Sequence, residues 1–183
     1  PKNPAAGRRE FLENEIEYDV PAGVDVKLIN TPDWTSAEAP LVAEFELRVP
    51  GWSIAAGSRS LVPVGLFGAV EKRTFEHSAR PHPLYFSFPY QHVDEPAIEL
   101  PPGWQVTSLP KERSADIKVV TYKSKPQASG GVLNLKRQIE LKSILIQSRF
   151  YPEVRDFYQA VRAADEDQVI ITRGAPTAAA AKD

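Results

Sequence analysis

Residues 132–165, with the sequence VLNLKRQIELKSILIQSRFYPEVRDFYQAVRAAD, change their hydrophobic period halfway along. In the first half apolar residues recur at every second position, with Arg137 as the exception, which predicts a β-strand with one buried face. That face comprises Leu133, Leu135, Ile139, Leu141 and Leu145. From Phe150 onward apolar residues recur every three or four positions, which predicts an amphipathic helix over about 151–165 that packs on the sheet. Pro152 suits the first turn of this helix.

Shorter patterned segments around this stretch predict the remaining elements. Further strands are expected over residues 24–30, 41–49, 60–67, 71–76, 84–90, 97–100, 104–109, 116–123 and 168–173. Residues 5–18 are expected to form a short helix, with a strand as the alternative. The 17 prolines argue against a helical bundle. The predicted fold is mainly β: an antiparallel β-sandwich with a short N-terminal helix and an amphipathic C-terminal helix packed on it.

The composition is that of an ordinary globular chain of 183 residues with a formal net charge of -2. No linker divides it, so we expect one domain over residues 1–173 and a disordered Ala-rich tail over 174–183. The chain contains no Met, which indicates a fragment of a longer protein, and no Cys, which excludes a thiolate nucleophile or metal ligand. The charge balance predicts no general attraction to nucleic acid, and no apolar run is long enough for a transmembrane helix.

The stretch from Phe75 to Trp104 contains all three histidines of the chain. The residue types of a metal site are present there, namely His77, His82, His92 and Asp94. However, Pro81 and Pro83 exclude a helix that would bring two histidines to one face. We therefore expect surface or turn histidines, with no metal and no cofactor.

Four residues are the candidates for ligand binding: Arg80, His82, His92 and Trp104. A residue that precedes a proline is pushed towards an extended conformation, so Arg80-Pro81-His82-Pro83 would present its Arg and His on a rigid segment. The alternative is a plain connector into a strand. A hydrolase that uses His82, His92 and Asp94 is a further hypothesis.

Aromatic and acidic residues offer two more possibilities. Tyr85, Phe86, Phe88 and Tyr90 could stack on sugars, but the shared parity of the last three favours a core face. The tryptophans near predicted turns are better candidates for exposure: Trp34, Trp52 and Trp104. The acidic run 165–167 follows the predicted helix, where the helix dipole disfavours negative charge, and is expected to face solvent.

An ordered set of short segments resembles one known family. The segments are Arg8-Arg9-Glu10-Phe11-Leu12, Val49-Pro50-Gly51-Trp52, Arg80 with His82-Pro83, Phe88-Pro89-Tyr90, Gly103-Trp104, Tyr151-Pro152 with Arg155-Asp156-Phe157, and Val169-Ile170-Ile171. Together they resemble the C-terminal region of bacterial three-part transglutaminase-like proteins. In these proteins an N-terminal domain of unknown function precedes a papain-like transglutaminase domain, and a β-rich domain follows.

This resemblance implies an accessory role. The Cys-His-Asp triad of the family would lie upstream of Pro1, so no catalytic residue carries over to this chain and we do not expect it to be an enzyme by itself. The implied partner is the upstream transglutaminase-like domain, beside which this domain would pack or position substrate, and the implied setting is periplasmic or membrane-associated. The alternative function is a carbohydrate- or peptide-binding module of the bacterial cell envelope.

Overall fold

The computed structural model describes residues 4–67 and 74–174. The chain divides into two compact units. Unit 1 comprises Pro1–Trp52 and Leu66–Glu71, and unit 2 comprises Ser53–Gly65 and Lys72–Asp183. The mainly β fold with antiparallel sheets, a short N-terminal helix and a C-terminal helix is confirmed.

Unit 1 is built from one helix and a two-stranded antiparallel sheet. Its elements are α1 (Pro4–Asp19), β1 (Asp25–Leu28) and β2 (Phe45–Arg48). Val26 and Leu28 alternate with exposed residues along β1 and are buried together with Leu12 of α1. The Glu13 carboxylate accepts a hydrogen bond of 2.9 Å from the Leu28 amide, so α1 is tied to β1 by a polar contact as well as by apolar burial.

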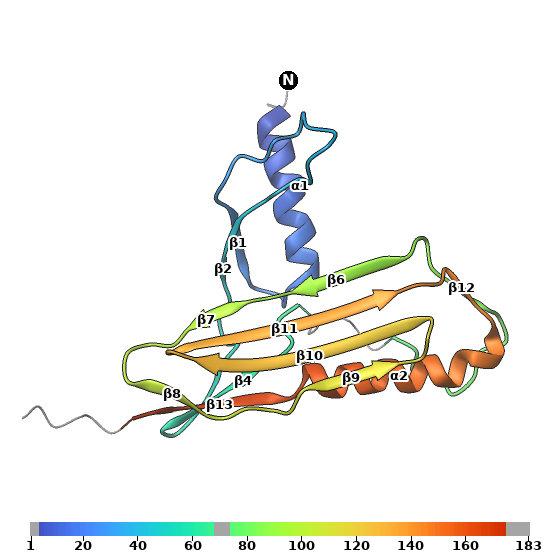
Figure 1. Ribbon diagram of the computed structural model, residues 1–183. Helices are drawn as coiled ribbons and strands as arrows, with labels where there is room; N and C mark the ends of the chain where they lie inside the picture. Colours follow the sequence, from blue (N-terminus) through green and yellow to red (C-terminus); the bar gives the residue numbers. More distant parts are fainter. Residues whose placement is uncertain (1–3, 68–73, 175–183) are drawn as a thin grey trace, which may run out of the picture. The chain divides into compact units, whose positions relative to one another are not determined.

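The larger sheet of unit 2 has five strands. They are β6 (Tyr90–Asp94), β7 (Ala97–Glu99), β9 (Arg113–Asp116), β10 (Val120–Ser129) and β11 (Val132–Leu141). The order is β6-β11-β10-β9, and β7 also pairs with β11 (Figure 1). β10 and β11 form a long hairpin closed by Gly130 and Gly131, both with positive φ, as a tight two-residue turn between twisted strands requires.

A second sheet of unit 2 has four strands in the order β3-β4-β13-β8. Its members are β3 (Ile54–Ala56), β4 (Arg59–Pro63), β8 (Trp104–Ser108) and β13 (Gln168–Arg173). A separate short pair joins β5 (Leu84–Tyr85) to β12 (Leu145–Ile146). Antiparallel pairing brings together segments that are far apart in the sequence, such as β4 and β13.

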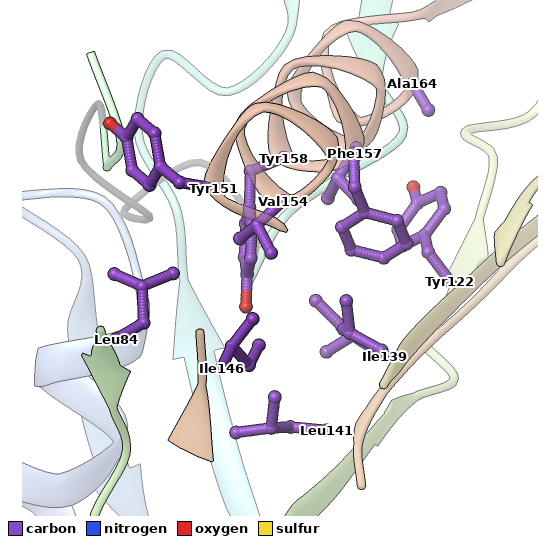
Figure 2. Close-up of a cluster of buried hydrophobic side chains, with 12 residues drawn as sticks. Leu84, Tyr122, Ile139, Leu141, Ile146, Tyr151, Val154, Phe157, Tyr158 and Ala164 are labelled. Atoms are coloured by element: carbon purple, nitrogen blue, oxygen red, sulfur yellow. The ribbon is translucent and has the colours of Figure 1, made fainter. Parts of the chain in front are cut away.

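The core of unit 2 lies between the five-stranded sheet and α2 (Tyr151–Asp165), which follows the short 3-10 helix η1 (Ser148–Phe150). Val154 and Phe157 of α2 point towards Tyr122, Ile139 and Leu141 of the sheet (Figure 2). The apolar stripe of the helix is buried as its spacing predicts. The sequence therefore located the helix, and Ile139 and Leu141 of the predicted buried face pack against it.

The strand predicted over 84–90 is wrong in extent. Only Leu84–Tyr85 pair, and β6 then covers Tyr90–Asp94, so His92 lies on a strand rather than in a turn. The pattern 132–147 is also interrupted: β11 ends at Leu141, and Leu145 is exposed while Ile146 is buried. A non-strand segment between two strands resets which parity faces the core, because side chains alternate only within a continuous strand.

Two further expectations concern segments at the edge of the described chain. The strand expected over 71–76 lies partly outside the described residues, and so does the tail from residue 175. Gly174, which was expected to begin the disordered tail, donates a hydrogen bond of 2.7 Å to the Gly103 carbonyl. Gly174 is therefore held by a backbone contact with the residue that precedes β8.

Candidate functional site

The four residues predicted for binding do not form one site. Arg80 and His82 are exposed on the segment before β5, and His92 is exposed on β6. Trp104 is half-buried at the start of β8, which lies at the opposite end of unit 2 from β12, the partner of β5 (Figure 1). The His92 ring packs on Tyr90 at 4.8 Å between ring centroids. Among the described residues, Arg80, His82 and His92 make no contact with one another, so their role in binding stays a prediction.

The exposed aromatics of unit 2 differ from the sequence expectation. Phe86 and Tyr90 are partly buried against the core, as their parity predicts. The core assignment of Phe88 is wrong, because this side chain is 65% exposed. β5 ends at Tyr85, so the chain from Phe86 to Pro89 no longer alternates as a strand does. Tyr85 is 72% exposed, which leaves two large rings at the surface of this segment.

An apolar surface is formed where β5 meets β12. Tyr85 lies directly opposite Leu145 in the antiparallel pair, and the Phe86 amide donates a hydrogen bond of 2.8 Å to the Ile144 carbonyl. Tyr85, Ile144 and Leu145 are all exposed, while their neighbours Leu84 and Ile146 are buried. We refer to Tyr85, Ile144 and Leu145 as the β5–β12 patch. Contiguous apolar side chains at a surface mark a contact site more often than single ones do.

A buried polar network lies at the C-terminal end of α2. The Arg137 guanidinium of β11 donates two hydrogen bonds to the Asp165 carboxylate, from Nε at 2.9 Å and from Nη2 at 3.0 Å. The Tyr122 hydroxyl donates a third to the same carboxylate at 2.7 Å. Arg137 Nη1 also donates to Asp94 Oδ2 at 3.3 Å. The side chains of Arg137 and Asp165 are 5% and 6% exposed, so this bidentate ion pair is formed away from water.

The network explains two departures from the sequence pattern. Arg137 interrupts the apolar face of β11 because it pairs with Asp165 inside the unit. The expectation that the acidic run 165–167 faces solvent is wrong for Asp165, which is buried. The unfavourable position of a carboxylate at the end of a helix is offset by the guanidinium and hydroxyl donors around it.

Two side chains of the network, Asp94 and Tyr122, have shifted pKa values. Burial raises the pKa of Asp94 above its ordinary value, and the nearby Arg137 opposes this rise. Burial is also the main cause that raises the pKa of the Tyr122 hydroxyl, and the charge of Asp165 raises it further. Tyr122 therefore remains a donor to Asp165 at neutral pH. These contacts tie the end of α2 to β10 and β11, which is a structural role.

The backbone approaches the same carboxylate closely. The Gly65 amide donates a hydrogen bond of 3.1 Å to the Asp165 carbonyl, and the Val64 amide donates one of 2.9 Å to the Asp167 carbonyl. A Cβ atom at Gly65 would lie 2.6 Å from the Asp165 Cβ, which is too close for any side chain. Residue 65 is therefore glycine because the segment after β4 passes Asp165 without space for a methyl group.

The described part of the chain contains neither a cluster of metal-binding side chains nor a membrane-spanning helix. Within residues 4–67 and 74–174, no three His, Asp or Glu side chains are grouped closely enough to hold a metal ion. Asp94, which a hydrolase would pair with His92, instead accepts a hydrogen bond from Arg137. In the same part of the chain, no helix combines the length and apolarity needed to cross a bilayer.

Comparison with known proteins assigns the family. Residues 58–171 match DUF3858, a domain of unknown function with a solved structure, and the chain belongs to this family. No curated protein matches the chain. The fold is similar to the crystal structure of a putative protease from Parabacteroides distasonis, with a TM-score of 0.53 and 12% identity. The match covers 64% of this chain and 24% of that protein, so the chain corresponds to about a quarter of its length.

Proposed function

We propose that this chain is a non-catalytic accessory region of a transglutaminase-like or peptidase-like protein of the bacterial envelope. Its β5–β12 patch would pack against the papain-like domain of the same protein and so help to position that domain or its substrate. The patch is the observation that carries this proposal. Tyr85 and Leu145, which are 72% and 51% exposed, lie opposite each other on β5 and β12, and Ile144, which is 41% exposed, directly precedes β12. Aromatic and aliphatic side chains of this kind form the centre of interfaces.

Two further observations support the proposal. The structural likeness covers only 24% of a putative protease, so most of that protein lies outside the shared fold. Two buried charged residues of unit 2, Arg137 and Asp165, are occupied in holding α2 to the sheet rather than exposed to a substrate. With no Cys in this chain, a papain-like nucleophile would come from the neighbouring domain.

The test compares this chain alone with the parent protein, using Leu145→Asp and the control Ile54→Asp. Both side chains are about half exposed on strands of unit 2, and Ile54 lies on β3, away from the patch. We expect neither change to alter unfolding of the isolated chain strongly. In the parent protein Leu145→Asp should lower the stability by about 2 kcal/mol or more, because a charge would be buried in the interface. Equal effects of both changes in the parent protein would contradict the proposal.

The proposed setting has its own test. An exported protein would be released with the periplasmic fraction or remain with the envelope, whereas recovery of the parent protein with the cytoplasmic fraction would contradict an envelope role. The isolated chain should also show no amidase activity towards peptide substrates, because the proposed nucleophile lies in the other domain.

The exposure of two rings favours a second candidate function, a glycan- or peptide-binding module. Tyr85 and Phe88 are 72% and 65% exposed on the segment that also carries Arg80 and His82. Exposed rings can stack on sugar faces. Phe88→Ala should abolish binding to an envelope glycan if this function holds, whereas the control Phe11→Ala, at a ring of unit 1 that is 54% exposed, should not. No binding to any envelope glycan or peptide would exclude this candidate and leave the packing role.

A further inference from the structure

A hollow of about 570 Å³ opens on the surface of unit 1, between α1 and the segment that follows β1. Leu12 of α1 and Leu28 of β1, both buried, form its apolar base. Arg8 and Arg9 line one wall, and Trp34 lines the other. The volume lies within the range of pockets that bind small ligands or short peptides. The sequence did not predict this site, because its two walls are separated by more than twenty positions in the chain.

The cationic wall comes from one face of α1. Ala5, Arg8, Arg9 and Leu12 are spaced three, four and seven positions apart, so they share a face of the helix. The Arg8 guanidinium carbon lies 5.3 Å from the centre of the Trp34 ring, a cation–π contact that holds both side chains in place. Arg9 lines the same hollow, and no ion pair or hydrogen bond occupies its guanidinium among the described residues.

The opposite wall is held by side-chain hydrogen bonds. Asp33 Oδ1 accepts hydrogen bonds from the Thr35 amide at 2.8 Å and from the Thr35 hydroxyl at 2.6 Å. The Asn30 side chain donates to the Val42 carbonyl and accepts from the Glu44 amide, both at 3.0 Å. The segment that carries Trp34 is therefore fixed before any ligand arrives, which lowers the entropic cost of binding.

The charged side chains of the hollow favour an anion. Arg8 and Arg9 supply two guanidinium groups, and Asp33 supplies one negative charge on the same hollow. Hydrogen bonds from Thr35 lower the pKa of Asp33, which keeps this side chain anionic. The surplus of positive charge attracts an anion. The planar guanidinium group also matches a carboxylate in a bidentate arrangement.

We propose that the unit 1 hollow binds a carboxylate-bearing peptide segment. Arg9 pairs with the carboxylate, Trp34 covers a neighbouring apolar side chain, and Leu12 and Leu28 provide the base beneath it. The carboxylate can belong to an acidic side chain or to a peptide C-terminus, and the test separates these sources. This inference does not depend on the proposed function, because it concerns unit 1 and none of the residues of the β5–β12 patch.

The test titrates the full chain with three short probes: acetyl-Leu-Ala-Glu amide, acetyl-Leu-Ala-Gln amide and acetyl-Leu-Ala-Ala with a free C-terminal carboxylate. The readout is the indole resonance of Trp34, assigned by its loss in Trp34→Phe. We expect the Glu probe or the free-carboxylate probe, or both, to shift this resonance, and the Gln probe to bind at least about tenfold more weakly. The acid that binds more tightly identifies the source of the carboxylate.

Arginine variants then locate the contact. Arg9→Gln should weaken the binding about tenfold, while Arg48→Gln, an exposed arginine of β2 outside the hollow, should leave it unchanged. Raised salt should weaken the binding, because the charges are close to solvent. If Arg9→Gln disturbs the fold, Arg9→Lys replaces it as the test variant. Lysine keeps the positive charge but lacks the bidentate geometry of the guanidinium group, so this variant should bind the probe with intermediate affinity. Equal binding of the Glu and Gln probes, or no Trp34 shift with any probe at about 10 mM, would overturn the proposal.

Discussion

Arg137 of unit 2 and Arg9 of unit 1 show how differently one residue type is used in this protein. The Arg137 guanidinium is 5% exposed and donates hydrogen bonds to two carboxylates, so its donors are committed within the fold. Arg9 is exposed beside a hollow, and no partner occupies its guanidinium among the described residues. A buried arginine must be paired because desolvating its charge is costly, whereas an exposed one is free to bind a ligand.

The largest expected effect comes from the same change at both positions. Arg137→Met leaves the Asp165 carboxylate buried without its main partner and should lower the free energy of unfolding of unit 2 by about 3–5 kcal/mol. Arg9→Met should change stability by no more than about 0.5 kcal/mol. Urea unfolding followed by hydrogen exchange, which reports each unit separately, measures both changes. Similar losses of stability in Arg137→Met and Arg9→Met would contradict the different roles assigned to the two arginines.

The double variant Arg137→Met with Asp165→Leu sharpens this result. Removing both charges also removes the cost of an unpaired buried carboxylate, so stability should recover in part relative to Arg137→Met alone. Failure of the second change to restore any stability would show that the loss arises from packing rather than from the unpaired charge.

Two glycine changes are expected to act in opposite directions. Gly65→Ala places a methyl group 2.6 Å from the Asp165 Cβ and should destabilise unit 2 by about 1–3 kcal/mol. Gly7→Ala in α1 meets no atom within 4 Å and should stabilise unit 1 by about 0.5–1 kcal/mol, because alanine favours the helix. Thermal unfolding of the two variants measures this difference. A stabilising effect of Gly65→Ala would show that the backbone around Asp165 can move to accommodate the methyl group.

The Tyr122 hydroxyl should link stability to alkaline pH. Tyr122→Phe removes the hydrogen bond to Asp165 and should cost about 1–3 kcal/mol at neutral pH. The pKa of Tyr122 is raised from 10.0 in the folded chain, so its stabilising contribution is full below that pH. As pH rises above 10.0, the unfolded tyrosine loses its proton first, and this contribution is lost.

The difference in free energy of unfolding between the native chain and Tyr122→Phe should therefore decrease above pH 10.0. Tyr18→Phe is the control, since Tyr18 is 82% exposed and should show little effect at any pH. Denaturant unfolding at a series of pH values measures this difference, and a difference that increases with alkalinity would contradict the assigned direction.

The smallest expected effect concerns the wall of the unit 1 hollow. Arg8→Gln removes the cation that lies over Trp34 and should change stability by about 0.5–1 kcal/mol, the range of an exposed cation–π contact. The fluorescence of the indole should change as the ring gains freedom. An unchanged emission in Arg8→Gln would show that Trp34 is held by its own segment, through the Asp33 and Asn30 hydrogen bonds.

Sequence patterns located the elements better than the sites. The period of 3.6 fixed α2 at Tyr151–Asp165, and the period of two identified the buried face of β11 up to Leu141. Both predictions succeeded because they rest on local alternation within one continuous element. The pattern did not extend past the breaks at 86–89 and 142–144, so Phe88 and Leu145 were assigned to the wrong environment.

The sequence by itself determined the mainly β class, the two helices and most of the strands, because hydrophobic period and proline placement act locally along the chain. Only the tertiary structure decided which charged side chains form ion pairs and which are available to a ligand. Arg137 and Asp165 are 28 positions apart in the sequence. Arg8 of α1 and Trp34 of the segment after β1 are also distant in the sequence, but they form a cation–π contact. Such partners are set by strand register and helix packing, which bring distant residues together and leave no local trace in the sequence.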